Sequence, residues 1–255
     1  MSKIENIIKE GMLVNRSWLC RHGIDRSSVD YYIREKILEA VTRGVYRKPG
    51  PPLKWQNVVY SLNELGYSVH VGHISALRFH GFQHYLMFSD NEEIFLYCNL
   101  MLPDWIQKIE NNIILKQLKR NPFPAGYNKG FTKIPFGPWD WPITYSEAER
   151  AFIELISTVD SSADISQAEA MFEGAANFRP DLVQLLLENC IQVKAKRLFL
   201  WMAKKYDHSW YKKLDMNRIN IGSGKRQIVK AGILDKEFMI TVPREKDYGD
   251  TEPLF

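Results

Sequence analysis

Residues 16–48, RSWLCRHGIDRSSVDYYIREKILEAVTRGVYRK, predict a helix, a glycine turn, a second helix and a basic two-stranded hairpin. Gly23 follows the first helix, where the chain needs a residue that tolerates a positive φ. Asp25 or Ser27 can then cap the second helix. This order of elements is that of a winged helix-turn-helix.

The second helix of this stretch is amphipathic. Val29, Ile33 and Ile37 recur at i, i+4 and i+8, with Tyr32 beside them, so one stripe is expected to be buried. The opposite face carries side chains that suit a DNA major groove, namely Arg26, Ser27, Ser28, Tyr31 and Arg34.

The hairpin that follows is the expected wing. Residues 37–41 and 45–47 read as two short strands joined across Thr42–Gly44. Cations stand at Arg43, Arg47 and Lys48, where a wing makes phosphate contacts.

The distribution of charge supports a double-stranded DNA partner at the N-terminal end. Residues 1–50 hold ten Lys/Arg and six Asp/Glu, residues 51–190 hold ten and sixteen, and residues 191–255 hold fourteen and eight. The overall excess of +4 is small, but a basic head, an acidic middle and a basic tail indicate an anionic partner at an end.

The segment Lys48–Pro52 (KPGPP) is the clearest linker, because proline there can continue neither a helix nor a ladder strand. It divides the 255 residues into a winged helix-turn-helix at 1–50 and a larger mixed domain at 51–255, so the expected fold class is α+β.

The second domain should contain both helices and strands. Residues 121–145, rich in proline, glycine and aromatics, are expected to form a long irregular connection. Ser146 and Glu149 form a predicted capping box for the helix that follows. Helices are expected at 53–65, 73–79, 146–157, 165–175, 180–190 and 193–206, strands at 67–71, 93–98 and 113–118, and an antiparallel hairpin pairing 226–230 with 238–242.

Cysteine content and hydropathy bear on the compartment. Cys20, Cys98 and Cys190 have no metal or redox spacing, so they are expected to be buried thiols in a reducing cytoplasm. The sequence has neither the apolar core of a signal peptide nor a run long enough to span a membrane, so no membrane partner is expected.

Two motifs invite a cofactor interpretation. His70, His73, His80 and His84 resemble zinc spacing, but Gly81 interrupts the helical turn and no cysteine lies nearby, so no metal is expected. The second motif, Gly222–Arg226 (GSGKR), resembles a phosphate loop. Ile219 replaces its first glycine and Arg226 its magnesium-binding Ser/Thr, so NTP hydrolysis is not expected.

Two basic clusters could form a partner surface in the second domain. Lys194 and Lys196 are expected on the basic face of a half-buried helix, and Lys225 and Arg226 lie beside the glycine-rich turn. No base–nucleophile pair or carboxylate set supports catalysis, so no catalytic residues, no cofactor and no enzyme activity are expected.

Taken along the chain, several motifs resemble AbiEi-type antitoxins of abortive-infection toxin–antitoxin systems. In the N-terminal half these are Trp18-Leu19, His22-Gly23-Ile24, Tyr31-Tyr32, Arg43–Arg47, Val69–Gly72 and Ser75-Ala76-Leu77. In the C-terminal half they are Glu149-Arg150-Ala151, Lys196–Trp201, His208 with Trp210, Gly222–Arg226 and Ile240–Pro243.

This resemblance implies a bifunctional protein of a type IV system. Its winged helix would repress its own operon by binding promoter repeats, and its C-terminal domain would neutralise a nucleotidyltransferase-like toxin, usually without a stable complex, as a phage-defence function. Two alternatives stay open. One is a ligand-responsive winged-helix regulator without a toxin partner, and the other is an enzyme acting on nucleic acid or nucleotides.

Overall fold

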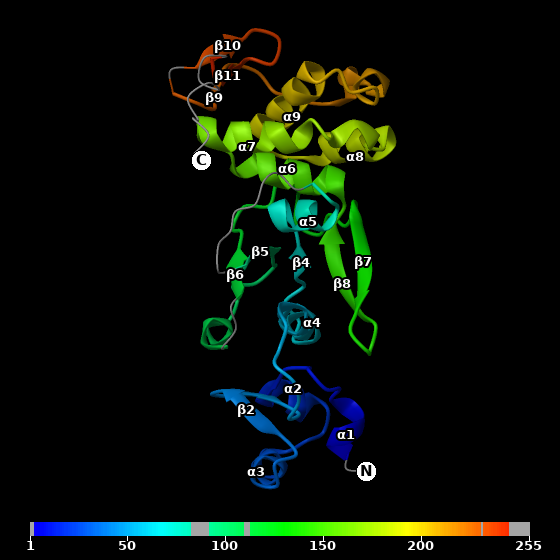
Figure 1. Ribbon diagram of the computed structural model, residues 1–255, viewed down its shortest axis with the longest axis vertical. Coiled ribbons are helices and arrows are strands. Elements are labelled where there is room, and N and C mark those ends of the chain that lie inside the picture. Colours follow the sequence, from blue (N-terminus) through cyan, green and yellow to red (C-terminus); the bar gives the residue numbers. More distant parts are fainter. Residues whose placement is uncertain (1–2, 83–91, 110–112, 231, 245–255) are drawn as a thin grey trace, which may run out of the picture. The chain divides into compact units, whose positions relative to one another are not determined.

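The computed structural model describes residues 3–82, 92–109, 113–230 and 232–244, and their contacts divide the chain into two compact units (Figure 1). Unit 1 comprises Met1–Val71, Phe88–Lys119 and Lys133–Tyr145. Unit 2 comprises Gly72–Met87, Arg120–Thr132 and Ser146–Phe255. The segment 48–52 therefore lies inside unit 1, and the division of activities at residue 50 stays a prediction.

The N-terminal part of unit 1 is a winged helix-turn-helix, as expected. Its sheet has the order β1-β3-β2, in which the short strand β1 was not predicted. The bounds are α1 Lys3–Ile7, β1 Val14–Asn15, α2 Arg16–Arg21, α3 Arg26–Arg34, β2 Glu39–Thr42 and β3 Val45–Arg47.

Residues beyond the linker complete the core of this winged helix. Trp141 lies in the same hydrophobic cluster as Trp18 and Leu19, and its ring stacks on Tyr60 at 4.4 Å between centroids. The Leu13 amide also donates to the buried Ser61 hydroxyl over 2.8 Å. A truncation at residue 50 would therefore expose apolar surface and leave the Leu13 amide without its partner.

The rest of unit 1 is built on a five-stranded sheet of order β6-β5-β4-β8-β7. Helix α4 (Trp55–Glu64) contributes Val58, Val59 and Leu62 to its core. The strands are β4 His70–Val71, β5 Glu92–Tyr97, β6 Ile113–Gln117, β7 Phe131–Phe136 and β8 Trp141–Ser146, and the 3₁₀ helix η1 spans Asp104–Lys108.

The expected irregular connection at 121–145 was wrong in its second half, which forms the hairpin β7–β8. The inward-facing residues of β8 alternate as Trp141, Ile143 and Tyr145, and Pro142 falls on the exposed side. Pro135 lies in the edge strand β7, where a missing amide hydrogen is tolerated. The sequence analysis missed this alternation because the prolines and glycines of the segment indicate an irregular loop.

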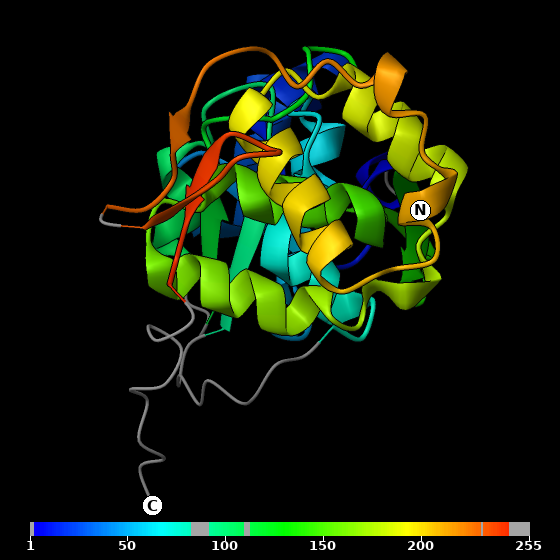
Figure 2. The ribbon, with the colours of Figure 1, turned by 90° about the horizontal axis from the view of Figure 1, so that it is seen from above.

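Unit 2 is organised around one helix whose central residues are all buried. Helix α6 (Ala148–Thr158) packs against α5, α7, α8 and α9, and every side chain from Glu149 to Ile156 is buried. Figure 1 shows α6 between α5 and the later helices, and Figure 2 shows α9 crossing over it. The other bounds are α5 His73–Phe79, α7 Ser162–Phe172, α8 Pro180–Asn189, α9 Val193–Lys205, and the 3₁₀ helices η2 Ala175–Asn177, η3 Tyr211–Lys213 and η4 Met216–Arg218.

The predicted C-terminal hairpin was wrong in its pairing. Strand β9 (Arg226–Gln227) pairs in parallel with β11 (Ile240–Val242), and the antiparallel partner of β11 is β10 (Ile233–Asp235). The Asp235 carboxylate accepts from the Phe238 amide over 2.8 Å, which closes the tight β10–β11 turn. A local turn therefore outcompetes the longer loop that the apolar runs indicated.

Two features bear on other expectations. Cys20 is exposed, which corrects the expectation that all three thiols are buried, while Cys98 is half-buried and Cys190 is buried. Burial raises the pKa of the Cys190 thiol to about 11. Among the described residues, no helix is both long and apolar enough to cross a membrane.

Candidate functional site

Helix α3 presents the expected polar face to solvent. Arg26, Ser27, Tyr31 and Arg34 are exposed and Ser28 is half-buried. The N-terminus of α3 is capped by the Asp25 carboxylate, which accepts from the Ser28 amide over 2.7 Å. This bond and the Ser27 hydroxyl keep the pKa of Asp25 below its ordinary value.

The exposed face of α3 is partly organised before any ligand arrives. The Arg34 guanidinium lies 5.6 Å from the centroid of the Tyr31 ring, and Tyr31 itself is 48 % exposed. A cation over an aromatic ring is held without losing its hydrogen-bond donors. Arg34 and Tyr31 therefore form an exposed pair in which the guanidinium supplies hydrogen-bond donors and the ring supplies a flat apolar surface.

A second arginine braces this helix against the wing. The Arg16 side chain donates to the Tyr46 hydroxyl over 2.8 Å and to the Asp30 carboxylate over 3.1 Å. These contacts join α2, α3 and β3 at one guanidinium. The spacing between α3 and the hairpin β2–β3 is thus held by side chains as well as by the core.

The three predicted cations of the wing differ in their surroundings. Arg43 is exposed at the hairpin tip, followed by Gly44 at φ +83°, whereas Lys48 is half-buried. Arg47 is 15 % exposed, and its guanidinium bonds Glu39 at 2.5 Å and the carbonyl oxygens of Gly50 and Pro51. Arg47 therefore ties the wing to the proline-rich segment.

The histidine cluster does not converge on one point among the described residues. His70 stacks on Tyr97, the His73 ring contacts the Thr158 hydroxyl, and the His80 ring contacts the Ser146 carbonyl. Burial lowers the pKa of His73 to about 4, so the ring is neutral at pH 7. His84 lies outside the described residues.

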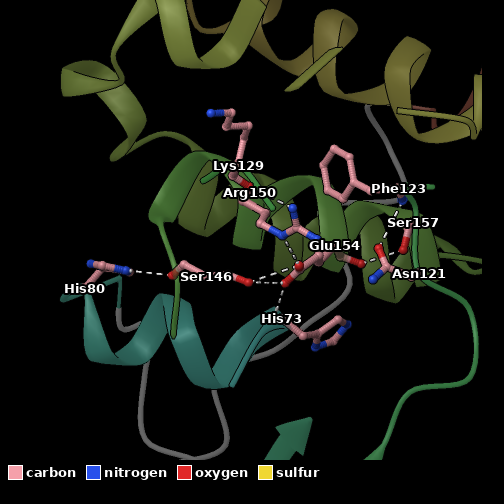
Figure 3. Close-up of polar contacts among 9 residues, drawn as sticks. All are labelled: His73, His80, Asn121, Phe123, Lys129, Ser146, Arg150, Glu154 and Ser157. Carbon is pink, nitrogen blue, oxygen red and sulfur yellow. Dashed lines mark hydrogen bonds and ion pairs between the residues drawn. The ribbon is translucent and has the colours of Figure 1, made fainter. Parts of the chain in front are cut away.

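A buried carboxylate on α6 contacts residues of α5 and β8 (Figure 3). Glu154 on α6 accepts from the Ser146 hydroxyl at 2.9 Å, the Arg150 guanidinium at 2.8 Å and the His73 amide at 3.0 Å. His73 has a φ of +56°, a strained value that this bond helps to hold. Because the Ser146 hydroxyl faces Glu154 and no described imidazole, the geometry positions α5 and α6 and does not activate a nucleophile.

Arg150 extends this network to the loop before β7 and to the first residue of that strand. Its guanidinium lies 4.2 Å from the centre of the Phe123 ring and 4.1 Å from that of Phe131, and it donates to the Lys129 carbonyl over 2.8 Å. The side chain is 1 % exposed. Sequence reasoning missed both Arg150 and Glu154, because a charged i, i+4 pair normally indicates a solvated helix face.

The predicted capping box at Ser146 was wrong. Helix α6 begins after Glu147, and Ser146 is the buried last residue of β8. Glu149 instead pairs with Arg179, which donates through its guanidinium and its own backbone amide. Burial alone would raise the pKa of Glu149, but these bonds from Arg179 outweigh it and the pKa is lowered.

The predicted partner cations of unit 2 fall into two groups. Lys196 is only 5 % exposed and the Lys194 ammonium donates to the Val159 carbonyl, so the expected basic face of α9 was wrong. Burial lowers the pKa of both lysines. Lys225 and Arg226 are exposed, and the loop that carries them is held by Arg197. Sequence reasoning missed this role of Arg197.

Comparisons with known proteins cover nearly the whole chain. Residues 91–243 match a family described as "Transcriptional regulator, AbiEi antitoxin, Type IV TA system", and residues 1–88 match its "AbiEi antitoxin N-terminal domain". No curated protein is significantly similar to the chain. The crystal structure of the RV2827C protein from Mycobacterium tuberculosis is similar with a TM-score of 0.55 at 12 % identity, covering 91 % of this chain and 86 % of that one, which supports the fold.

Proposed function

Because the chain belongs to a family of transcriptional regulators, the AbiEi antitoxins of type IV toxin–antitoxin systems, we propose that it represses its own operon and neutralises the toxin encoded there. In this proposal the winged helix-turn-helix at 1–50 binds repeats in the promoter, and residues 51–255 carry the antitoxicity. The toxin is a nucleotidyltransferase-like protein, and antitoxicity does not require a stable complex with it.

The exposed face of α3 is the observation that carries the DNA half of the proposal. Arg26 and Arg34 can donate two hydrogen bonds each to guanine edges, and Ser27, Ser28 and Tyr31 add shorter-range contacts. Arg43 at the wing tip and Lys48 contact phosphates on either side of the groove. Arg47 contributes through the shape of the wing, because its donors already bond Glu39, Gly50 and Pro51.

The DNA half is tested by titrating the upstream region with the full chain at several salt concentrations. The logarithm of the affinity should fall with a slope of about 0.9 per phosphate neutralised. Arg26→Ala and Arg34→Ala should each weaken specific binding by about 1–3 kcal/mol, the usual magnitude of one bidentate base contact. Lys133→Ala, which removes an exposed cation from β7, is the matched control. Equal losses in all three variants would contradict the assignment of α3 as the recognition helix.

Antitoxicity must be tested apart from repression and without cutting the chain. Residues 51–71 pack with the winged helix in unit 1, so a fragment that begins at residue 51 would lose the contacts of Leu13 and Trp18. We therefore use the full-length Arg26→Ala/Arg34→Ala variant, expressed from an unrelated promoter in bacteria that produce the neighbouring gene's product. If the variant rescues growth, antitoxicity is separate from promoter binding. If both the variant and the unaltered chain fail to rescue growth, the antitoxin proposal is contradicted.

One cavity favours the alternative of a ligand-responsive regulator. It has a volume of about 300 Å³, at the lower end of small-ligand pockets, and is lined by His80, Gly81, Phe82, Ala170, Met171 and Gly174. An effector that binds there should change the affinity for the promoter. Replacing Gly174 with Leu would fill the cavity and should abolish that response while leaving DNA binding intact.

A further inference from the structure

The glycine-rich loop at 221–226 is held from beneath by one buried arginine. Arg197 on α9 is 1 % exposed and donates to the carbonyl oxygens of Ile221 at 2.7 Å, Gly224 at 2.6 Å and Met239 at 3.2 Å. These bonds turn two carbonyl groups of the loop inward. The backbone of the loop between η4 and β9 is therefore held in a defined conformation by these hydrogen bonds.

The outer side of this loop presents amide hydrogens. In a trans peptide the N–H points opposite to the C=O, so the Lys225 amide faces away from Arg197. Within the described part of the chain, the amides of Ser223, Gly224 and Lys225 have no acceptor, and all three residues are exposed. Gly222 and Gly224 have φ of +62° and +72°, the alternation that builds a concave anion-binding nest.

Among the described residues, the charge at the loop is positive and has no carboxylate partner. The three acceptors of Arg197 are neutral carbonyl oxygens, and no carboxylate of the described residues pairs with Arg197, Lys225 or Arg226. Burial and the nearby Arg226 lower the pKa of Arg197, so the two guanidinium groups repel each other. A buried charge without a counter-ion is costly, and an anion at the loop would offset that cost.

We propose that the loop 221–226 binds a phosphate group through the amides of Ser223, Gly224 and Lys225 and the side chains of Lys225 and Arg226. The phosphate belongs to a nucleotide or to a nucleic-acid backbone. The site binds without hydrolysing, because Arg226 stands where a phosphate loop has its magnesium-binding hydroxyl. This inference goes beyond the antitoxin proposal and does not depend on promoter binding.

The loop can be followed directly in the full chain labelled with ¹⁵N-glycine, in which the amides of Gly222 and Gly224 report on the site. The titrants are inorganic phosphate, ATP and a short single-stranded RNA, each matched in ionic strength with sodium chloride. Lys225→Ala/Arg226→Ala removes the two exposed cations. Lys129→Ala/Lys213→Ala removes two exposed cations elsewhere in unit 2 and is the control.

Saturable shifts of Gly222 and Gly224 with phosphate, weakened about tenfold or more by Lys225→Ala/Arg226→Ala and unchanged by the control, would support the site. Tighter binding of ATP than of RNA then identifies the phosphate as that of a nucleotide, and tighter binding of RNA identifies it as that of a nucleic-acid backbone. Three results would overturn the proposal: no shift of these glycines, an equal loss in the control variant, or binding of neither ATP nor RNA above inorganic phosphate, which indicates an adventitious ion only.

Discussion

Replacing Arg179 with alanine should destabilise unit 2 through the carboxylate that it leaves behind. Glu149 on α6 is 4 % exposed, and Arg179 donates to its two oxygens at 2.9 Å each through the guanidinium. Arg179→Ala removes both guanidinium bonds from this charge, which keeps the backbone amide of residue 179 at 3.0 Å and a hydrogen bond to its own backbone. A broken buried pair costs about 3–5 kcal/mol, and the 55 % exposure of Arg179 reduces this to about 2–3 kcal/mol.

The measurement is equilibrium unfolding in urea, followed by circular dichroism at neutral pH. Arg218→Ala is the matched control, because Arg218 pairs with Glu188 at 3.0 Å near the surface and should contribute at most about 1 kcal/mol. Arg179→Ala/Glu149→Gln should recover part of the loss, since a neutral amide is cheaper to bury than an unpaired carboxylate. Equal effects of Arg179→Ala and Arg218→Ala, or no recovery in the double variant, would refute this reasoning.

The same pair predicts a pH dependence. The folded-state pKa of Glu149 lies below its ordinary value of 4.5, so the unfolded state binds more protons as the pH falls. The stabilisation is complete above pH 4.5 and is lost as the pH falls through the lower folded-state pKa. The difference in unfolding free energy between the unaltered chain and Arg179→Ala should therefore shrink below pH 4.5.

Three further substitutions, the first with a matched control, test other parts of the fold. Gly232→Ala would place a Cβ 2.4 Å from the Val242 carbonyl oxygen and should cost about 1–3 kcal/mol or more, whereas Gly174→Ala meets its nearest neighbour at 3.4 Å and should be tolerated in the same urea unfolding assay. Arg150→Met keeps apolar contact with Phe123 and Phe131 but removes the charge beside Glu154, and should lower the unfolding free energy by about 3 kcal/mol or more; a loss under 1 kcal/mol would contradict the role given to this pair. Lys36→Gly relieves a φ of +57° just after α3 and should raise the unfolding free energy slightly, by about 0.5 kcal/mol, without changing DNA affinity.

Local rules predicted the elements whose signals lie within a few residues. Gly23 has the expected positive φ of +74°, Asp25 caps α3, and Pro180 occupies the first turn of α8. Each of these depends on backbone sterics or on one short hydrogen bond, which neighbouring residues alone specify. The family resemblance could also be predicted from the sequence, because the order of short motifs along the chain can be read without knowing how the residues pack.

The candidate site was predicted less completely, because whether a charged side chain is exposed depends on what packs over it. Arg26, Tyr31 and Arg34 are exposed as expected, but Arg47 bonds the proline-rich segment and Lys196 is buried in α9. From sequence alone, a lysine or arginine on a helix is predicted to be exposed, because the residues that pack over it are not known. The partners of Arg197 come from residues 24, 27 and 42 positions away, which no sequence spacing indicates.

The winged helix, most helix bounds and the family can be predicted from the amino-acid sequence, since they follow from local conformational preferences and residue order. Two features become visible only in the packed chain: residues beyond the linker complete the winged-helix core, and β9 and β11 pair in parallel. The packing also buries Glu149, Arg150 and Glu154 of α6. Burial and strand pairing depend on desolvation costs and on contacts between residues that are distant in the sequence, and these contacts exist only once the chain is packed.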